Sequence, residues 1–244
     1  MQSMQRIDRH HAANGGRPKV TGLLVVDKPT GWSSMDVVRR VRLAAGRVKT
    51  GHAGTLDPMA TGVLICCLGR TATKAVPKLM AVPKRYEALV DLSAFTTTDD
   101  AEGERELIKV SEPPTRAAIE RVCARFIGEI EQAPPAYSAV KVGGRRAYKL
   151  ARRGESVPLS TRTVHVDAIE VQDFAWPHLS LRVDCGKGTY IRSLARDIGH
   201  VLGTGGHLAS LRRTAVGPYT LGQAITVQRC AEGIEQADLL AVPE

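Results

Sequence analysis

The sequence of 244 residues has few aromatic side chains and no long apolar segment. Phe, Trp and Tyr make up 4% of the chain, and the longest strictly apolar run covers only residues 63–68. A membrane-spanning helix needs about 20 apolar residues, so none is predicted. Residues 1–19 lack the apolar stretch of a signal peptide. We therefore expect a disordered basic tail at 1–19, no membrane partner and a cytoplasmic protein.

The sequence also lacks the cysteine patterns of disulfide-rich and zinc-binding proteins. Its cysteines are Cys66, Cys67, Cys123, Cys185 and Cys230. Their number is odd and no pair has C-x-x-C spacing, so we expect small buried side chains rather than disulfides or metal ligands. A phosphate-binding loop of the Walker type is absent as well. His52 and Asp57 have no clustered His or Cys neighbours. We expect no metal and no cofactor.

Positive charge is in excess, which points to a polyanionic partner. Lys and Arg number 34 against 25 Asp and Glu, giving a net charge of +9. Residues 141–153 concentrate this charge around Tyr148, with no acidic residue among them. The cations of this segment are Lys141, Arg145, Arg146, Lys149, Arg152 and Arg153. Such a run is either a solvated face or a set of phosphate contacts on a nucleic acid.

Hydrophobic periodicity predicts an α+β fold. We expect strands over residues 22–27, 62–68, 85–94, 163–174 and 179–185. Helices are expected after Ser33, in a capping box with Asp36, after Thr115, and after Thr189 as a cap. Strands alternate with single helices and hairpins rather than with regular βαβ units. This order favours a mixed, largely antiparallel central sheet with flanking helices.

The segment 51–62, GHAGTLDPMATG, is the most unusual in the chain. Its glycines allow positive φ angles and close approach of a ligand. Pro58 disfavours a helical conformation at Asp57. The segment is either a rigid loop that presents the Asp57 carboxylate or an ordinary Asp-Pro turn.

A second candidate segment is CGKGTYIR, residues 185–192, at a strand-to-helix junction. A helix N-terminus offers free N–H groups to anions. Lys187 and Arg192 add positive charge, and Tyr190 adds a surface on which a base can stack. The alternative is a tight turn followed by a solvated arginine.

Six segments together resemble one family. GHAGTLDPMATGVL, residues 51–64, resembles the catalytic motif of the bacterial tRNA pseudouridine-55 synthases, the TruB family. The other segments match this family in order and spacing: GLLVVDKPTGWSS (22–34), KRYEALVDLS (84–93), YSAVKVGGRRAYKLARRG (137–154), CGKGTYIRSLARDIG (185–199) and HLASLRRTAVGPY (207–219). The resemblance covers about residues 20–222 and implies the pseudouridine synthase fold.

The resemblance implies roles for individual residues. Asp57 is at the position of the catalytic aspartate, and Tyr86 at the position that stacks on the target base and handles protons. Arg192 is at the position that pairs with this aspartate, which leads us to expect a low pKa for Asp57. The further positions implied to support or contact substrate are His52, Tyr190, Leu211, Lys28 with Pro29, and Asp100. Lys187 and the cations of 141–153 are expected to contact the RNA backbone.

The implied reaction isomerises the T-loop uridine at tRNA position 55 and needs no cofactor. Its first step stays open: Asp57 attacks C1′, attacks C6 or removes the 2′ proton. The expected partner is the T-arm of tRNA, bound by a monomer without an obligate protein partner. Two alternatives remain: an RNA-binding helper of tRNA folding that works without catalysis, and a guide-RNA-dependent relative.

We predict three parts of the chain. Residues 20–222 are expected to form the catalytic domain, with an RNA-contacting insertion at about 134–160. Residues 223–244 are expected to be a short extension, too short for the C-terminal RNA-binding domain of most bacterial family members.

Overall fold

A computed structural model describes residues 20–137, 141–142, 145–146 and 160–243. Ten strands form one sheet in the order β14-β1-β3-β12-β4-β11-β10-β7, with β13 paired to β12 and β2 to β3. Only the β1–β14 and β3–β12 pairs are parallel. The predicted α+β class with a mixed, largely antiparallel sheet is therefore confirmed. Within the described part of the chain, no helix is long and apolar enough to cross a membrane.

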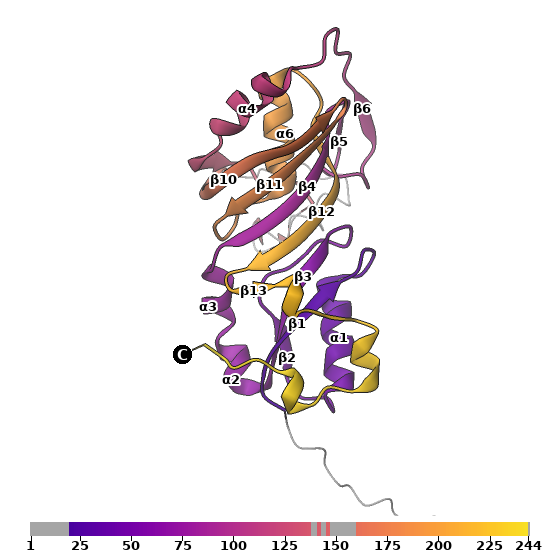
Figure 1. Ribbon diagram of the computed structural model, residues 1–244, viewed down its shortest axis with the longest axis vertical. Coiled ribbons are helices and arrows are strands. Elements are labelled where there is room, and N and C mark those ends of the chain that lie inside the picture. Colours follow the sequence, from indigo (N-terminus) through magenta and orange to yellow (C-terminus); the bar gives the residue numbers. More distant parts are fainter. Residues whose placement is uncertain (1–19, 138–140, 143–144, 147–159, 244) are drawn as a thin grey trace, which may run out of the picture.

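Figure 1 shows the elements in their order along the chain. The helices are α1 (Ser34–Ala44), α2 (Gly69–Lys74), α3 (Val76–Ala81), α4 (Arg116–Ala124) and α6 (Ile191–Leu202). The strands of the large sheet are β1 (Gly22–Lys28), β2 (Thr50–His52), β3 (Thr61–Leu68), β4 (Lys84–Asp91), β7 (Gly128–Gln132), β10 (Arg162–Ala175), β11 (His178–Cys185), β12 (His207–Val216), β13 (Tyr219–Thr220) and β14 (Ile225–Thr226). Two small hairpins are β5 (Ala94–Thr96) with β6 (Arg105–Leu107), and β8 (Lys141–Val142) with β9 (Arg145–Arg146).

Strands β1 and β3 are buried on both faces, which explains their almost continuous apolar sequences. Leu24 and Val26 pack with α1, whereas Leu23 and Val25 pack with residues of α2 and α3. The apolar run at 63–68 lies in β3 and is fully buried. All five cysteines are buried free thiols, as expected from their apolar surroundings.

Helix α1 begins at the capping box that its sequence predicts. Ser33 accepts a hydrogen bond from the backbone of Asp36, whose side chain bonds back to the Ser33 backbone. This capping box satisfies N–H groups that the first helical turn leaves free. Val37, Val38 and Val41 share the buried face, and Gly46 follows the helix with a φ of +70°.

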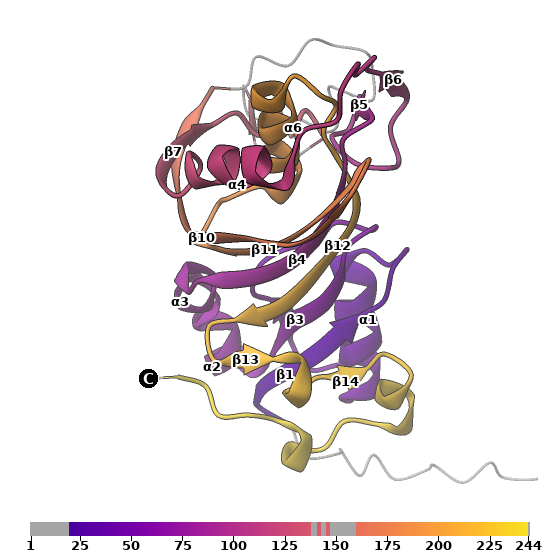
Figure 2. The ribbon, with the colours of Figure 1, turned by 45° about the horizontal axis from the view of Figure 1, so that its top comes forward.

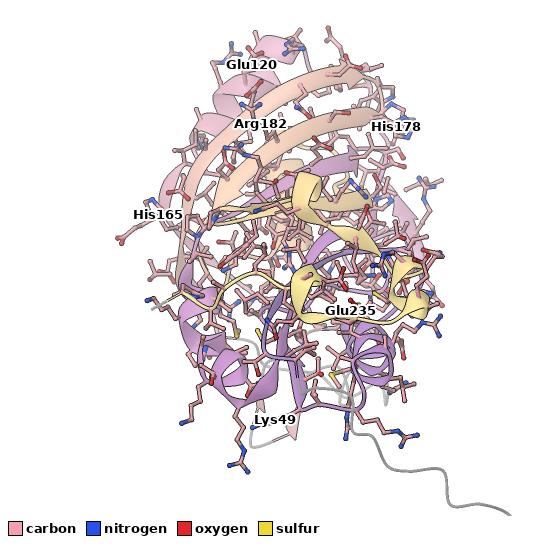
Figure 3. All side chains as sticks on the ribbon, turned by 60° about the horizontal axis from the view of Figure 1, so that its bottom comes forward. Lys49, Glu120, His165, His178, Arg182 and Glu235 are labelled. Carbon is pink, nitrogen blue, oxygen red and sulfur yellow. The ribbon has the colours of Figure 1, made fainter. Side chains whose placement is uncertain are left out.

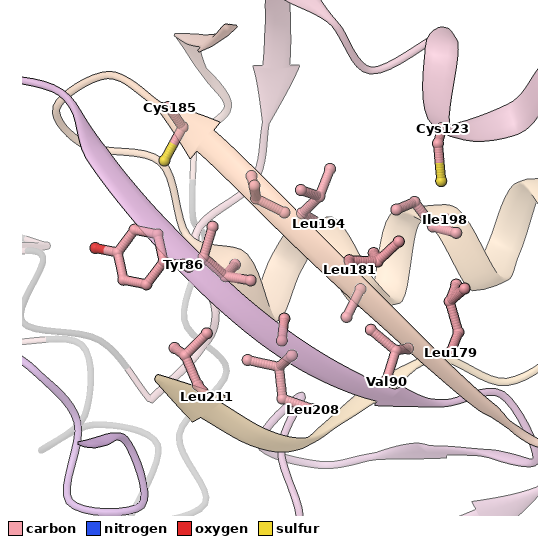
Figure 4. Close-up of a cluster of buried hydrophobic side chains, with 14 of the residues drawn as sticks. Tyr86, Val90, Cys123, Leu179, Leu181, Cys185, Leu194, Ile198, Leu208 and Leu211 are labelled. Carbon is pink, nitrogen blue, oxygen red and sulfur yellow. The ribbon is translucent and has the colours of Figure 1, made fainter. Parts of the chain in front are cut away.

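Helices α4 and α6 cover one face of the sheet formed by β10, β11, β4 and β12 (Figure 2). Between them lies a cluster of buried side chains that includes Leu181, Leu194 and Ile198 (Figure 4). The predicted cap at Thr189 is wrong. Tyr190 is the N-cap residue of α6, and the Thr189 hydroxyl instead donates to the carbonyls of His165 and Gly186.

The strand expected over residues 85–94 is split in two. The Asp91 carboxylate accepts hydrogen bonds from the backbone and hydroxyl of Ser93, which turns the chain between β4 and β5. The face predicted to be buried remains buried on both sides of this turn, from Tyr86 to Ala94.

Part of the basic segment falls outside the described residues. Lys149, Arg152, Arg153 and the tail at 1–19 are among the residues not described. Lys141, Arg145 and Arg146 are described only by their backbone, which takes part in the antiparallel pairing of β8 with β9.

Residues 223–243 continue the same fold. β14 pairs with β1, and Leu23 and Leu240 exchange backbone hydrogen bonds of 2.9 and 2.8 Å. Cys230 and Ile234 join the core beside α1. Figure 3 shows this segment, with Glu235, running across the front of the molecule between Lys49 and Glu120 at opposite ends of the view. The segment predicted as an extension therefore contributes core side chains.

Candidate active site

Side chains from α1, β1 and α6 hold the loop that carries Asp57. The first is Ser34 of α1. The buried Ser34 hydroxyl donates to the carbonyl of Leu56 and accepts from its N–H, at 3.0 and 2.8 Å. This single side chain thus satisfies both backbone groups of the residue before Asp57. Asp57 therefore lies on a loop held by side-chain bonds to its neighbours rather than on a free surface turn.

Lys28 holds the loop from the end of β1. Its fully buried ammonium donates to the carbonyls of Pro29, Trp32 and Pro58, at 2.9, 2.7 and 3.1 Å. Burial lowers the pKa of Lys28 to about 8, although the negative charge of Asp57 opposes this shift. All three contacts of the Lys28 ammonium are to backbone carbonyls, so its role is to support the loop.

A chain of charges leads from the partly exposed Asp57 to the buried Arg192 and Asp100. Asp57 Oδ2 lies 3.0 Å from Arg192 Nη2, and Arg192 Nη1 lies 3.2 Å from Asp100 Oδ2. The carbonyls of Thr98 and Tyr137 each accept a further bond from Arg192 at 3.0 Å. Arg192 is only 4% exposed. The guanidinium is thus held in one orientation, facing Asp57.

Asp57 does not have the low pKa expected from its arginine neighbour. Burial raises the pKa of Asp57, and the Arg192 guanidinium only partly opposes this. The physical reason is that losing water disfavours the charged carboxylate more than one shared cation restores. Asp100 is also negative and shares the same arginine, which raises the pKa of Asp57 further.

Tyr86 lies where the buried cluster meets the Asp57 loop. Figure 4 shows its ring beside Leu211 and Cys185, with the hydroxyl pointing away from Val90 and Leu181. Burial raises the pKa of the Tyr86 phenol. A cavity of 330 Å³ is lined by Asp57, Tyr86, Tyr190, Arg192 and Leu211 together. The structure therefore brings these predicted site residues to one cavity.

Tyr190 is held at its backbone and at its ring. The Gln132 side chain, which is 0% exposed, accepts from Tyr190 N–H at 2.8 Å and donates to Tyr190 C=O at 3.1 Å. Arg162 lies over the ring, 4.7 Å from its centroid, and donates to the Gly188 carbonyl. These contacts fix an aromatic face at the wall of the cavity.

The remaining predicted residues differ in whether they line this cavity. Lys187 lines it, as do Lys84 and Arg162. Asp100 is buried and bonds to Thr98, Glu102 and Arg192. His52 lies in β2 opposite Cys66 and is not among the residues that line the cavity. Burial lowers the pKa of His52.

Sequence reasoning did not find three residues that hold this site: Ser34, Gln132 and Arg213. Each is a polar side chain that the fold buries almost completely. Arg213 is two residues from Leu211 on the same strand, so strand alternation places both on one face. Arg213 therefore shares a face with the apolar Leu211, and a charged residue on such a face was the available signal. Groups of three or more potential metal ligands are absent from the described part of the chain.

The site combines the Asp57–Arg192 pair with a tyrosine at one cavity beside a mixed sheet, and the Asp57 side chain is 37% exposed. Comparisons with known proteins identify the family. Residues 40–191 match the TruB family pseudouridylate synthase N-terminal domain, and residues 192–239 match the tRNA pseudouridylate synthase B C-terminal domain. The chain belongs to the TruB family of pseudouridylate synthases, which are isomerases.

Curated relatives cover most of the chain. It is 47% identical over 226 residues to tRNA pseudouridine synthase B of Arthrobacter sp. (strain FB24), covering 90% of this chain and 74% of the relative. It is 50% identical over 218 residues to tRNA pseudouridine synthase B of Thermobifida fusca (strain YX), covering 86% of this chain and 74% of the relative.

Solved structures show the same fold. A Cbf5-Nop10-Gar1 complex contains a chain that is 34% identical, with a TM-score of 0.67, over 89% of this chain and 58% of that one. An H/ACA RNP bound to a substrate RNA containing 2′-deoxyuridine gives 28% identity and a TM-score of 0.64, over 91% of this chain and 63% of that one. This chain therefore spans less than two thirds of these matched chains.

Proposed function

We propose that this protein converts the T-loop uridine of tRNA, position 55, to pseudouridine, with Asp57 as the catalytic carboxylate. The observation that carries the proposal is the 3.0 Å pair between Asp57 and the buried Arg192, in a cavity that Tyr86 also lines. The relatives named tRNA pseudouridine synthase B supply the substrate class. The cavity of 330 Å³ is large enough to hold a single base.

The reaction breaks the N1–C1′ bond of uridine and forms a C5–C1′ bond on the same base. The C5 proton leaves and N1 gains a proton, so no other reactant is consumed. The base must first leave its stack in the RNA loop, at a cost of a few kcal/mol. Tyr86, Tyr190 and Leu211 would receive the extruded base, because their side chains line the cavity beside Asp57.

Asp57 is suited to proton transfer as well as to attack on the sugar or the base. A carboxylate with a raised pKa is a stronger base than an ordinary one. The positive charge of Arg192 would favour the ionised form of Asp57. Because Asp100 and the carbonyls of Thr98 and Tyr137 hold Arg192, its contact with Asp57 would also fix the direction of the carboxylate. Lys187 and the basic segment 141–153 would hold the phosphates of the T-arm, which makes binding salt-dependent.

The test is a synthetic T-arm stem-loop incubated with the protein, without added cofactor, beside an anticodon stem-loop of equal length. Chemical derivatisation of pseudouridine and primer extension locate the product. We expect pseudouridine at one T-loop position and none in the anticodon loop. Binding to the T-arm without product would instead support the folding-helper alternative.

Lys28→Met is expected to move the acid limb of the pH–rate profile to higher pH. The carboxylate form of Asp57 is needed, and the positive charge of Lys28 lowers the pKa of Asp57. Without that charge, Asp57 is protonated at a higher pH, so the rate at mildly acidic pH falls more than at neutral pH. The measurement is the single-turnover rate across pH for both proteins.

Lys49→Met is the matched control, because Lys49 is exposed on another part of the surface (Figure 3). Its profile should coincide with that of the unmodified protein. An unmoved acid limb in Lys28→Met would show that Lys28 does not act on the charge of Asp57.

A further inference from the structure

Arg213 is a charged residue in the interior of the protein, beside the proposed site. It is only 1% exposed and is the largest fully buried side chain among the residues that the structure describes. On β12 it lies opposite Gly62 of β3 on one side and Tyr86 of β4 on the other. Its backbone thus connects the strand that follows the Asp57 loop to the strand that carries Tyr86.

The side chain of Arg213 binds the Asp57 loop directly. Its Nε donates to the Val63 carbonyl at 2.8 Å, and Nη2 donates to the Gly54 carbonyl at 3.1 Å. A longer contact of 3.5 Å joins Nη1 to the Thr55 carbonyl. One guanidinium therefore bridges β3 to the segment just before Asp57.

The backbone around Arg213 has no spare room. Gly62 has a φ of +100°, and a Cβ atom there would lie 2.2 Å from the Arg213 carbonyl oxygen. A glycine is therefore required where β3 and β12 approach each other. This close approach of the two strands fixes the position of the Arg213 backbone relative to the Asp57 loop. The bonds from the Arg213 side chain to Gly54 and Val63 therefore set the position of the loop.

The charge of Arg213 is not neutralised by a neighbouring acid. Among the described residues, no carboxylate forms an ion pair with Arg213, whereas Arg192 pairs with Asp57 and Arg212 pairs with Asp27. The guanidinium lines the same cavity as Asp57 and Tyr86. Its charge and hydrogen bonding lower the pKa of the Tyr86 phenol, against the effect of burial.

A purely structural role accounts poorly for these facts. Burying a charge without a counter-ion costs several kcal/mol. The backbone carbonyls that Arg213 binds offset part of this cost, and all of them lie on segments that flank Asp57. Placing a catalytic carboxylate requires a side chain that holds its loop. Arg213 meets this requirement, because it bonds to the loop and lines the cavity.

We infer that Arg213 is a positioning residue, which holds the loop segment before Asp57 against the strand that carries Tyr86, in the mutual placement that isomerisation needs. This inference rests on the proposed function. Arg213 acts through Asp57 and Tyr86 and need not touch the uridine itself. A displacement of about 1 Å between reacting groups costs on the order of 100-fold in rate.

The test compares Arg213→Met, Arg213→Lys and Arg212→Met. Arg212 is the matched control, because it is the next residue on the same strand but pairs with Asp27 on the opposite side. Single-turnover rates at saturating protein, Kd values for the T-arm stem-loop and the folded fraction are measured for each. The unmodified protein is measured first, so that failure of the proposed function is seen separately as an absence of product.

Arg213→Met is expected to lower the rate of the folded protein by about 100-fold with an unchanged Kd. Arg213→Lys should recover part of the rate, because it keeps the charge but cannot reach both Val63 and Gly54 as a rigid fork. Arg212→Met should keep the rate. An unmodified rate in folded Arg213→Met, a rate loss matched by weaker binding, or failure of both Arg213 variants to fold would each overturn the inference.

Discussion

Asp57→Asn is expected to lower the single-turnover rate by at least about 10⁴-fold while leaving the Kd for the T-arm within about tenfold. The amide is nearly the same size as the carboxylate and can still accept a bond from Arg192, so the loop should keep its position. It has no negative charge, and it neither attacks carbon nor takes a proton as a carboxylate does. Loss of rate without loss of binding is therefore the expected signature.

The matched control is Asp238→Asn. Asp238 is ion-paired with Arg229 in the C-terminal segment and does not line the Asp57 cavity. This variant should keep both rate and binding. Substantial turnover by Asp57→Asn would contradict the role proposed for Asp57. If that variant produces no pseudouridine but still accelerates tRNA folding, the protein also has the helper activity.

Arg192→Met is the substitution with the second largest expected effect, because it removes one cation from two carboxylates. Asp100 is 3% exposed and would remain buried beside Asp57 without its cation. Removing one partner of a buried ion pair costs about 3 to 5 kcal/mol of unfolding free energy. The pKa of Asp57 would also rise further, since Arg192 is the main group that lowers it. Stability and rate should therefore both fall.

A double variant separates the two effects of Arg192. Arg192→Met with Asp100→Leu removes the carboxylate that would be left unpaired, so part of the lost stability should return in a urea denaturation. The rate should stay low, because Asp57 still lacks its cation. Arg182→Met is the control for a half-exposed pair with Glu170, where the expected change in stability is about 1 kcal/mol or less. Recovery of the rate in the double variant would show that Arg192 matters only to the fold.

Sequence patterns predicted most of the fold, because its strongest signals are local. The capping box at Ser33, the alternation from Tyr86 to Ala94 and the paired strands β10 and β11 each follow from neighbouring residues. The order of the strands in the sheet is different. Contacts such as β1 with β14, or β3 with β12, join segments far apart in the chain, and no local periodicity specifies them.

The candidate site shows the same division. Family resemblance indicated Asp57, Tyr86 and Arg192, and the structure places all three at one cavity. The pKa of Asp57 could not be read from its partner alone, since burial outweighs the nearby guanidinium. The supporting bonds from Ser34, Gln132 and Arg213 end on backbone carbonyls or N–H groups. Backbone groups are present at every residue, so a sequence motif does not reveal which of them will accept such a bond.

The most direct test of the account is the structure of Asp57→Asn in complex with a T-arm stem-loop. The slow variant should hold the substrate without converting it. We expect the target uridine to be extruded from the loop and to lie among Tyr86, Tyr190 and Leu211, with its sugar beside the side chain at position 57. A uridine that stays stacked in the RNA loop, with the cavity beside Arg192 empty, would contradict the account.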